Sequence, residues 1–337
     1  MRLLVLGGTQ FVGHAAVAEG LARGWEVTVA NRGVSGPAQD GVTAVRLDRT
    51  QPGAFGAIAG QHFDVVLDTW SQAPCVVRDA ARALASSTDR WVNVSSRSVY
   101  AWPPPRGADE SAPVVEGDPD ADVTDYAADR RGGELAVERE IGADRVVHLR
   151  AGLILGPRDN VGRLPWWLRW VARGGQTLAP APATLPIQYV DPRDLVALGL
   201  DAAVAGRHGP VDVVCPPDRT TLGDVLHACV AATGSDATFS WIDPSWLLAQ
   251  GVEIWTELPI WIPESEDAYA MHQSDVSRAL GWGLRVRPVA ETVADCWDWV
   301  QQVDASGTAP SPRDAVGMDP QREEDLLARW RRQAGSA

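Results

Sequence analysis

Residues 3–13 read Leu-Leu-Val-Leu-Gly-Gly-Thr-Gln-Phe-Val-Gly, and this stretch decides the fold. The apolar run 3–6 is typical of a short buried strand, and the two glycines after it mark a tight turn. Such a turn lets backbone amides approach a pyrophosphate, while the positive end of the following helix faces the same group. We therefore predict a strand–turn–helix unit that binds a dinucleotide. Its predicted contact residues are Gly7, Gly8, Thr9, Gln10, Phe11, Val12 and Gly13.

Apolar runs continue to alternate with helical stretches through the first 150 residues. The predicted strands are 3–6, 26–30, 43–47, 64–67, 91–94 and 146–149. The predicted helices between them include 12–23, 76–85 and 124–140. Continuous apolar strands separated by helices are typical of a parallel sheet that is buried on both faces. The predicted fold class is α/β, a Rossmann-type doubly wound parallel sheet with a smaller C-terminal substrate-binding lobe.

The pattern changes after about Gly152, where prolines and tryptophans become more frequent. We predict a dinucleotide-binding domain over residues 1–155, to which residues 187–205 return, and a mainly substrate-binding lobe over residues 156–303. Further predicted helices are 164–172, 193–204, 222–232 and 290–303. Residues 304–337 are predicted to form a linker at Ser306–Pro312 and a last helix that is capped by Asp319 and begins with Pro320.

Composition excludes several classes of protein. The chain of 337 residues has a formal net charge of −14, and its 30 basic Lys+Arg positions are all arginine. Without lysine it cannot be a Schiff-base enzyme, a P-loop protein or a kinase of the usual type. The acidic balance disfavours nucleic acid as a partner. The cysteines are scattered along the chain, which predicts a cytoplasmic protein with reduced thiols. The histidines and cysteines lack zinc-like spacing, which predicts no metal site. No apolar run reaches the ~20 residues of a membrane span, so we predict no membrane contact. We expect a small-molecule substrate, and a monomer and a homodimer both remain open.

The glycine turn, followed by Asn31-Arg32-Gly33 after the second strand, resembles an extended, atypical branch of the short-chain dehydrogenases/reductases, the NAD-dependent epimerase/dehydratase-like proteins. The usual extended pattern has a glycine where Gln10 stands, and this branch accepts a larger residue there. The resemblance implies a Rossmann fold and an oxidoreductase. It further implies that Asp48 contacts the adenine. By the same resemblance Asp68, Thr69 and Trp70 line the nicotinamide ribose side.

The end of the second strand indicates which cofactor is used. A carboxylate at this place would hold the ribose 2′-hydroxyl of NAD, whereas an arginine favours the 2′-phosphate of NADP. The sequence has Ala30-Asn31-Arg32 there, without a carboxylate. We predict Arg32 as the 2′-phosphate ligand, with Asn31 beside it, and NADP as the cofactor. NAD remains possible.

Two segments resemble the catalytic segments of the same family. In residues 91–100 the serine four places before Tyr100 is Ser96, which the resemblance makes catalytic. Tyr126 and Arg130 occupy the place of the family's Tyr-x-x-x-Lys, and their i, i+4 spacing puts both on one face of a helix. A phenol titrates near ~10, and a fixed cation beside it favours release of its proton. We therefore predict Tyr126 as the acid/base and Arg130 as the cation that also holds the cofactor ribose. Both residues are predicted to bind the cofactor.

Several functions remain open from the sequence. Arginine is not equivalent to lysine, so the site could be degenerate and the protein a dinucleotide-binding sensor. Sugar-nucleotide epimerisation also remains open, whereas 4,6-dehydration is disfavoured because Arg97-Ser98 stands where an acidic pair is needed. An RNA-binding relative is disfavoured by the pI of about 4.8. The favoured function is reduction of a small carbonyl compound by NADPH, because Arg32 indicates a dissociable cofactor.

Overall fold

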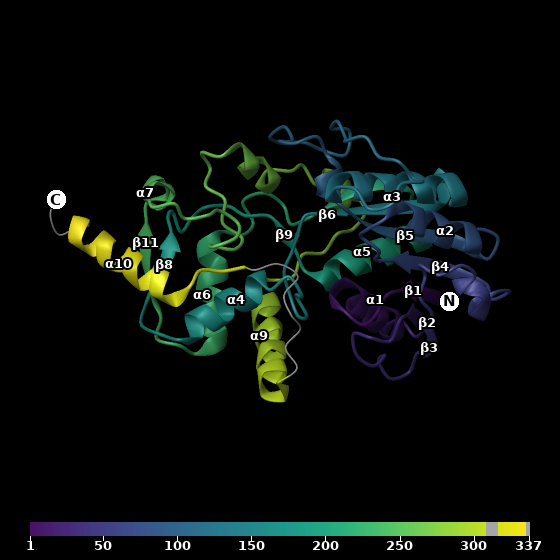
Figure 1. The fold of residues 1–337 in the computed structure, drawn as a ribbon, viewed down its shortest axis with the longest axis horizontal. Helices are drawn as coiled ribbons and strands as arrows, with labels where there is room; N and C mark the ends of the chain where they lie inside the picture. The colour runs from purple at the N-terminus through teal and green to yellow at the C-terminus, as the bar shows by residue number, and fades with distance from the viewer. Residues whose placement is uncertain (308–315, 335–337) are drawn as a thin grey trace. The chain divides into compact units, whose positions relative to one another are not determined.

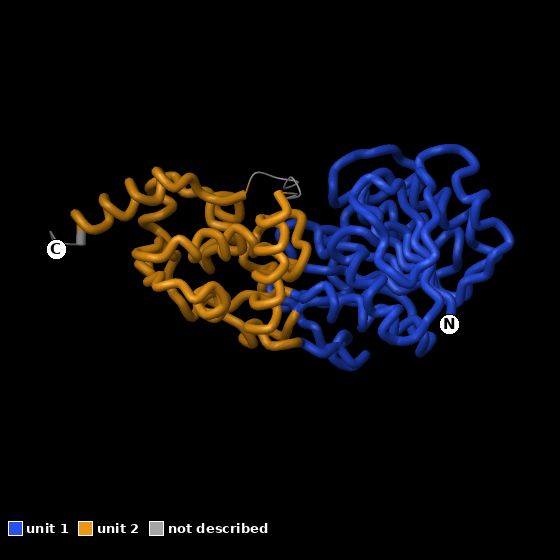
Figure 2. Tube along the Cα trace, turned by 90° about the horizontal axis from the view of Figure 1, so that it is seen from below, with its two compact units in different colours: residues 1–152, 190–214, 274–286 blue, residues 153–189, 215–273, 287–337 orange. Residues whose placement is uncertain are grey.

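The computed structural model of the chain describes residues 1–307 and 316–334, with the side chain of residue 334 left out. The chain forms two compact units (Figure 2). The first contains residues 1–152, 190–214 and 274–286. The second contains residues 153–189, 215–273 and 287–337. The predicted linker Ser306–Pro312 falls mostly on residues outside the described part.

The first unit is built on a seven-stranded parallel sheet (Figure 1), with the strand order β10-β6-β5-β4-β1-β2-β3. Its strands are β1 (Arg2–Leu6), β2 (Glu26–Asn31), β3 (Thr43–Arg46), β4 (Phe63–Asp68), β5 (Thr88–Ser96), β6 (Val146–Ala151) and β10 (Gly209–Val213). The order reverses between β1 and β4, as in a doubly wound sheet. The predicted α/β fold class is therefore confirmed. Strand β10, which pairs with β6, had no counterpart in the prediction.

Helices cover both faces of this sheet. α1 (Phe11–Ala22) packs with α5 (Pro192–Val204), and α2 (Pro74–Leu84) packs with α3 (Tyr126–Ile141). Apolar residues of α2, α3 and the strands form one continuous core, in which Trp91 and Phe63 are fully buried. The shorter helices of the unit are η1 (Ala54–Ile58), η2 (Arg97–Val99), η3 (Ala143–Arg145) and α8 (Ser277–Gly281). Because all seven strands are parallel, their carboxyl ends lie at one edge of the sheet.

The second unit is mainly helical. α4 (Arg163–Ala172), α6 (Leu222–Thr233) and α9 (Val289–Ser306) pack against one another. β8 (Gln176–Pro180) and β11 (Thr238–Ile242) form a parallel pair. The remaining elements are β7 (Leu153–Ile154), β9 (Tyr189–Val190), α7 (Pro244–Ala249), η4 (Asp267–His272) and α10 (Pro320–Ala334). Within the described ranges, no helix is long and apolar enough to cross a bilayer.

The last helix, α10, is attached to the second unit by several contacts, and one of them is made by a buried carboxylate. Glu323 is 4% exposed and accepts hydrogen bonds from Trp170 Nε1 at 2.8 Å and from the Leu178 amide at 2.9 Å. It also pairs with Arg173, whose guanidinium lies over the Trp170 ring. The Asp319 side chain accepts the Gln321 amide at 2.9 Å, which confirms the predicted cap. α10 is therefore an integral part of this unit.

Candidate functional site

The glycine turn leaves no room for side chains. Gly7 and Gly8 have φ angles of +126° and +95°, which side chains rarely allow. A Cβ on Gly7 would lie 2.4 Å from Thr69 Oγ1, and a Cβ on Gly13 would lie 2.5 Å from the Gly8 nitrogen. The N-terminus of α1 has no side-chain cap and no acidic residue in its first turn. Helix amides are thus available next to a turn with a bare backbone, which suits a phosphate.

The segment after β2 is tied to this turn. Asn31 donates from Nδ2 to the Gly7 carbonyl at 3.0 Å and accepts the Gly33 amide at 2.8 Å. Its side chain therefore shapes the turn. Arg32 is exposed, and among the described residues it has no hydrogen-bond or ion-pair partner. Hydrogen bonds from Thr50 lower the pKa of Asp48, and the nearby charge of Arg32 contributes. Arg32 and Asp48 therefore lie close together at the ends of β2 and β3.

The end of β4 is held by an arginine that the sequence analysis did not identify. Arg49 donates to both oxygens of Asp68, at 2.6 and 2.8 Å, and its guanidinium lies 5.1 Å from the centre of the Trp70 ring. Asp68 also accepts the Trp70 amide at 3.0 Å, and Thr69 donates to the Leu6 carbonyl at 3.0 Å. The Asp68 carboxylate is completely buried and engaged in these contacts, so a ligand can meet this segment only at Thr69, Trp70 and the backbone.

Helix α3 carries the predicted acid/base at its first residue. Asp125 caps the helix by accepting the amides of Ala127 and Ala128, each at 3.0 Å. Tyr126 is 54% exposed, and the Arg130 guanidinium carbon lies 6.0 Å from the centre of its ring. Arg130 is 6% exposed and donates to the Trp70 carbonyl. Its Nε is buried, and no described residue accepts a hydrogen bond from it. The predicted cation thus connects the Tyr126 helix with the end of β4.

Ser96 lies at the carboxyl end of β5, opposite Ala151 of β6. Its Oγ accepts the Ser98 amide at 3.1 Å and so caps η2. Helix α3 packs against both η2 and β5. The structure therefore places all four features in the first unit: the glycine turn after β1, Ser96 at the end of β5, and Tyr126 and Arg130 on α3, which packs against β5. Tyr100 is 1% exposed and packs in the core.

A buried set of charged and polar side chains surrounds η2, the turn that follows Ser96. The Tyr100 hydroxyl donates to Asp212 at 2.7 Å and accepts from Arg150 at 3.2 Å. Arg97 donates to the second Asp212 oxygen at 3.2 Å. Arg150 also donates to Glu134 through two nitrogens, at 3.0 and 2.9 Å. These groups are all buried, and together they join η2, β6, β10 and α3.

The titration of Asp212 gives a testable pH dependence. Burial raises the pKa of Asp212 to about 6, against the opposing effects of Arg97 and Tyr100. Between about pH 4 and 6 the folded protein keeps a proton that an unfolded aspartate, with its pKa of 3.8, has already released. The native state then binds more protons, so this group lowers the free energy of unfolding as the pH rises through that window.

We expect Asp212→Asn to remove this contribution, which is at most about 3 kcal/mol for a pKa difference near two. Denaturant unfolding at pH 4.5 and 6.5 measures it. The variant should lose less stability than the wild type over this interval, while exposed Asp118→Asn should follow the wild type. Equal losses in the wild type and Asp212→Asn would contradict the assignment.

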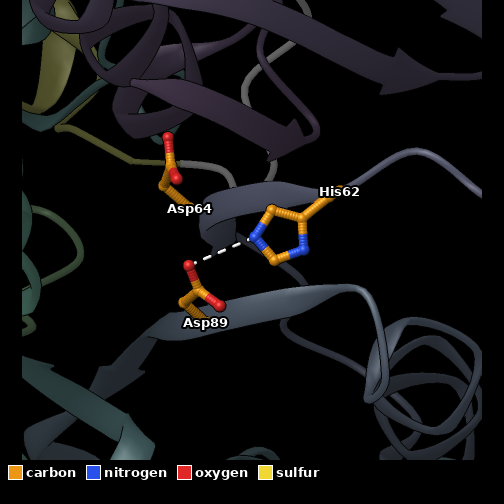
Figure 3. A group of neighbouring side chains, drawn as sticks. All are labelled: His62, Asp64 and Asp89. Carbon is orange, nitrogen blue, oxygen red and sulfur yellow. Dashed lines mark hydrogen bonds and ion pairs between the residues drawn. The ribbon is translucent and has the colours of Figure 1, made fainter.

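Two other features are formed mainly by residues outside the predicted site, although Arg49 also lines the first of them. A groove of about 960 Å³ runs between residues 49–62 and α2. Near its end, His62, Asp64 and Asp89 offer ligand atoms within 4.8 Å of one another (Figure 3). The His62 ring is hydrogen-bonded to Asp89 at 3.2 Å, and Asp64 accepts the Arg2 amide at 2.6 Å. This cluster lies at the amino ends of β4 and β5. Neither the spacing of these three residues along the chain nor their residue types match a zinc motif, so the sequence did not indicate this cluster.

The comparisons with known proteins agree with this architecture. No family model matches the chain. The 2′-dehydrokanamycin reductase of Streptomyces kanamyceticus is 33% identical over 196 residues, which are 55% of this chain and 51% of that protein. The chain thus spans about half the length of this curated relative.

Solved structures match over nearly the whole chain. The Bordetella bronchiseptica enzyme WbmH, in complex with NAD⁺, has a TM-score of 0.68 at 17% identity, covering 89% of this chain and 98% of that one. The Thermotoga maritima UDP-glucose 4-epimerase with UDP-glucose has a TM-score of 0.63 at 16% identity, covering 90% and 99%. The chain therefore shares the fold of these solved enzymes, among them NAD-bound and UDP-glucose-bound ones. The resemblance seen in the sequence is confirmed at this level.

Proposed function

We propose that the chain is an NAD(P)-dependent oxidoreductase that reduces the carbonyl group of a small molecule with hydride from NADPH. The observation that carries the proposal is the bond from Arg130 to the Trp70 carbonyl. It brings the helix of Tyr126 to the end of β4, and Thr69 of the same segment touches the glycine turn. A dinucleotide-binding turn and a paired phenol and cation are thereby joined through one segment.

The residues present fit a dinucleotide. A Cβ on Gly13 would lie 2.5 Å from the Gly8 nitrogen, so helix α1 packs directly against the glycine turn. The uncapped amides at the start of α1 can therefore contact a pyrophosphate beside this turn. Arg32, which has no hydrogen-bond or ion-pair partner in the part of the chain that the structure describes, offers its guanidinium for a 2′-phosphate. Arg46 lies beside the segment that contains Arg32, because a Cβ on Gly33 would lie 3.9 Å from the Cδ and Nε of Arg46. Arg46 was not predicted, and it gives this corner a second positive charge next to Arg32.

The proposed chemistry assigns one task to each side chain. When bound, the nicotinamide supplies the hydride that adds to the carbonyl carbon. The Tyr126 hydroxyl donates its proton to the carbonyl oxygen, and Ser96 donates a hydrogen bond to the same oxygen. The fixed charge of Arg130 stabilises the phenolate that remains. Tyr126 is exposed, so solvent can return the proton.

The first substrates to test follow from the charge and from the curated relative. That relative acts, by its name, on a dehydrokanamycin. Residues 107–129, which lead into α3 and form its first turn, contain eight carboxylates and no basic residue. Arginines of other segments pair with Asp120 and Glu110, which leaves an excess of negative charge there. A cationic keto-sugar therefore suits this chain better than a sugar diphosphate, and amine-bearing ketones belong first in a substrate panel.

Epimerisation is the second candidate, and it is favoured by the fold shared with UDP-glucose 4-epimerase. An epimerase that regenerates its cofactor in each cycle would keep the nucleotide bound. We expect the purified protein to exchange added NADPH freely in equilibrium dialysis. One equivalent of NAD that leaves only on denaturation would favour epimerisation.

Arg32 is expected to determine the preference for NADP. A charge-assisted contact contributes about 1.5–3 kcal/mol, so Arg32→Ala should weaken NADPH binding roughly 10- to 100-fold. Binding of NADH, which lacks the 2′-phosphate, should change little. Energy transfer from tryptophan to the bound nicotinamide measures both dissociation constants. The control is Arg2→Ala, because Arg2 lies at the amino end of β1, away from the carboxyl ends of the strands. Equal losses of NADPH and NADH affinity in Arg32→Ala would contradict the role of Arg32.

A further inference from the structure

The contacts of Glu134 suggest a role for a residue that the proposed chemistry does not use. Its side chain is completely buried on α3, two helical turns after Tyr126. Oε1 accepts the Ser95 hydroxyl at 2.8 Å and Arg150 Nε at 3.0 Å. Oε2 accepts Arg150 Nη2 at 2.9 Å and Arg131 Nη1 at 2.8 Å. Both oxygens are thus used twice, by donors from β5, β6 and α3.

These contacts link the two elements that carry the predicted catalytic residues. Ser95 directly precedes Ser96 on β5, and Arg150 is its register partner on β6. Tyr126, Arg130 and Glu134 follow one another at intervals of four along α3, so they lie on one stripe of the helix. The same carboxylate therefore holds the strand of Ser96 and the helix of Tyr126.

The contacts continue around the Ser96 turn. Arg150 bridges Glu134 to the Tyr100 hydroxyl, which donates to Asp212, and Asp212 accepts from Arg97. Ser96 caps the start of η2, Arg97 is the first residue of this helix, and Tyr100 caps its end. The turn is thus fixed on both sides. Removing one member leaves the others buried and unpaired, which is costly.

We propose that Glu134 and Ser95 are a positioning pair that fixes the Ser96 hydroxyl relative to the Tyr126 phenol. The inference rests on the proposed function, because it assigns the geometry of that same site. Neither residue touches the substrate. A carbonyl oxygen must meet both hydroxyl groups at once, and a displacement of about 1 Å can cost ~100-fold in rate. A buried carboxylate with four donors limits such displacements.

Ser95→Ala is the test variant, because it removes only the tie to β5 and leaves Glu134 paired with Arg150. We expect kcat to fall about tenfold, with the NADPH dissociation constant and the melting temperature near those of the wild type. Ser95→Thr keeps the hydroxyl and should restore most of kcat. The matched control is Glu138→Gln, which removes another acid of α3, paired with His148 at 3.1 Å, but not with Ser95.

The kinetic result separates a positioning role from a structural one. Two results would overturn the inference. One is a wild-type kcat in Ser95→Ala. The other is a fall in kcat that is the same in Ser95→Ala and Glu138→Gln when both variants have lost the same stability. Wild-type protein without turnover on any carbonyl would instead overturn the proposed function.

Hydrogen exchange then tests the positioning pair independently of activity. In Ser95→Ala, amides at residues 96–100 and 126–130 should both exchange faster than in the wild type. In Glu138→Gln they should not. Unchanged exchange at both segments in Ser95→Ala would contradict the inference, whatever the enzyme activity.

Discussion

Tyr126→Phe is expected to lower turnover by roughly 10²- to 10⁴-fold, the usual contribution of a positioned acid/base. Phenylalanine keeps the ring beside Arg130 and removes only the proton donor. The ring is more than half exposed, so losing its hydroxyl leaves no buried polar group unpaired. NADPH should bind as in the wild type, because the glycine turn and Arg32 are untouched. Oxidation of NADPH at 340 nm with an accepted ketone measures turnover, and energy transfer measures binding in the same samples.

The matched control for this variant is Tyr269→Phe. It removes a phenolic hydroxyl that donates to the Pro186 carbonyl at 2.9 Å in the second unit. We expect Tyr269→Phe to lower stability and to leave the rate per folded molecule unchanged. A Tyr126→Phe variant that keeps more than about a tenth of wild-type turnover would show that another group supplies the proton.

Gly13→Ala is expected to abolish detectable NADPH binding. Its Cβ would lie 2.5 Å from the Gly8 nitrogen and 3.0 Å from the Gly8 Cα, and both are backbone atoms that cannot rotate away. Helix α1 must therefore move from the turn, which takes its amides away from the pyrophosphate. We expect an affinity loss of at least about 100-fold, corresponding to ~3 kcal/mol.

Gly56→Ala separates this effect from a general cost of replacing glycine. Gly56 lies in η1 with no atom near the added methyl group. The Gly56→Ala variant should bind NADPH as the wild type does. Circular dichroism checks that Gly13→Ala stays folded, and a folded Gly13→Ala with wild-type affinity would contradict the proposed role of the turn.

Much of the first unit could be predicted because local patterns and tertiary packing agree there. Apolar runs such as Leu3–Leu6 and Val146–Leu149 lie within strands that are buried on both faces. β10 was missed because Gly209 and Pro210 are poor strand formers and Asp212 interrupts its apolar pattern. Its place is decided by pairing with β6, and a local window does not contain this information.

The candidate site could be predicted only in part, for a related reason. The residues within motifs, such as Gly13 and Tyr126, were identifiable by their spacing. Residues that hold those motifs in place were not. Arg150 and Asp212 each follow apolar residues in the sequence, but no predicted strand contains either of them, and nothing in the sequence names Glu134 or Tyr100 as their partners. Arg49 likewise becomes meaningful only when folding brings it to Asp68.

The most direct test of the account is a combined titration and turnover measurement on the wild-type protein. NADPH is titrated by energy transfer from tryptophan, and an amine-bearing ketone panel is then added while absorbance at 340 nm is followed. We predict saturable binding of one NADPH per chain, tighter than NADH, and oxidation of NADPH with at least one ketone. Tight NADPH binding without any oxidation would identify a dinucleotide sensor, and no binding of either nucleotide would contradict the account as a whole.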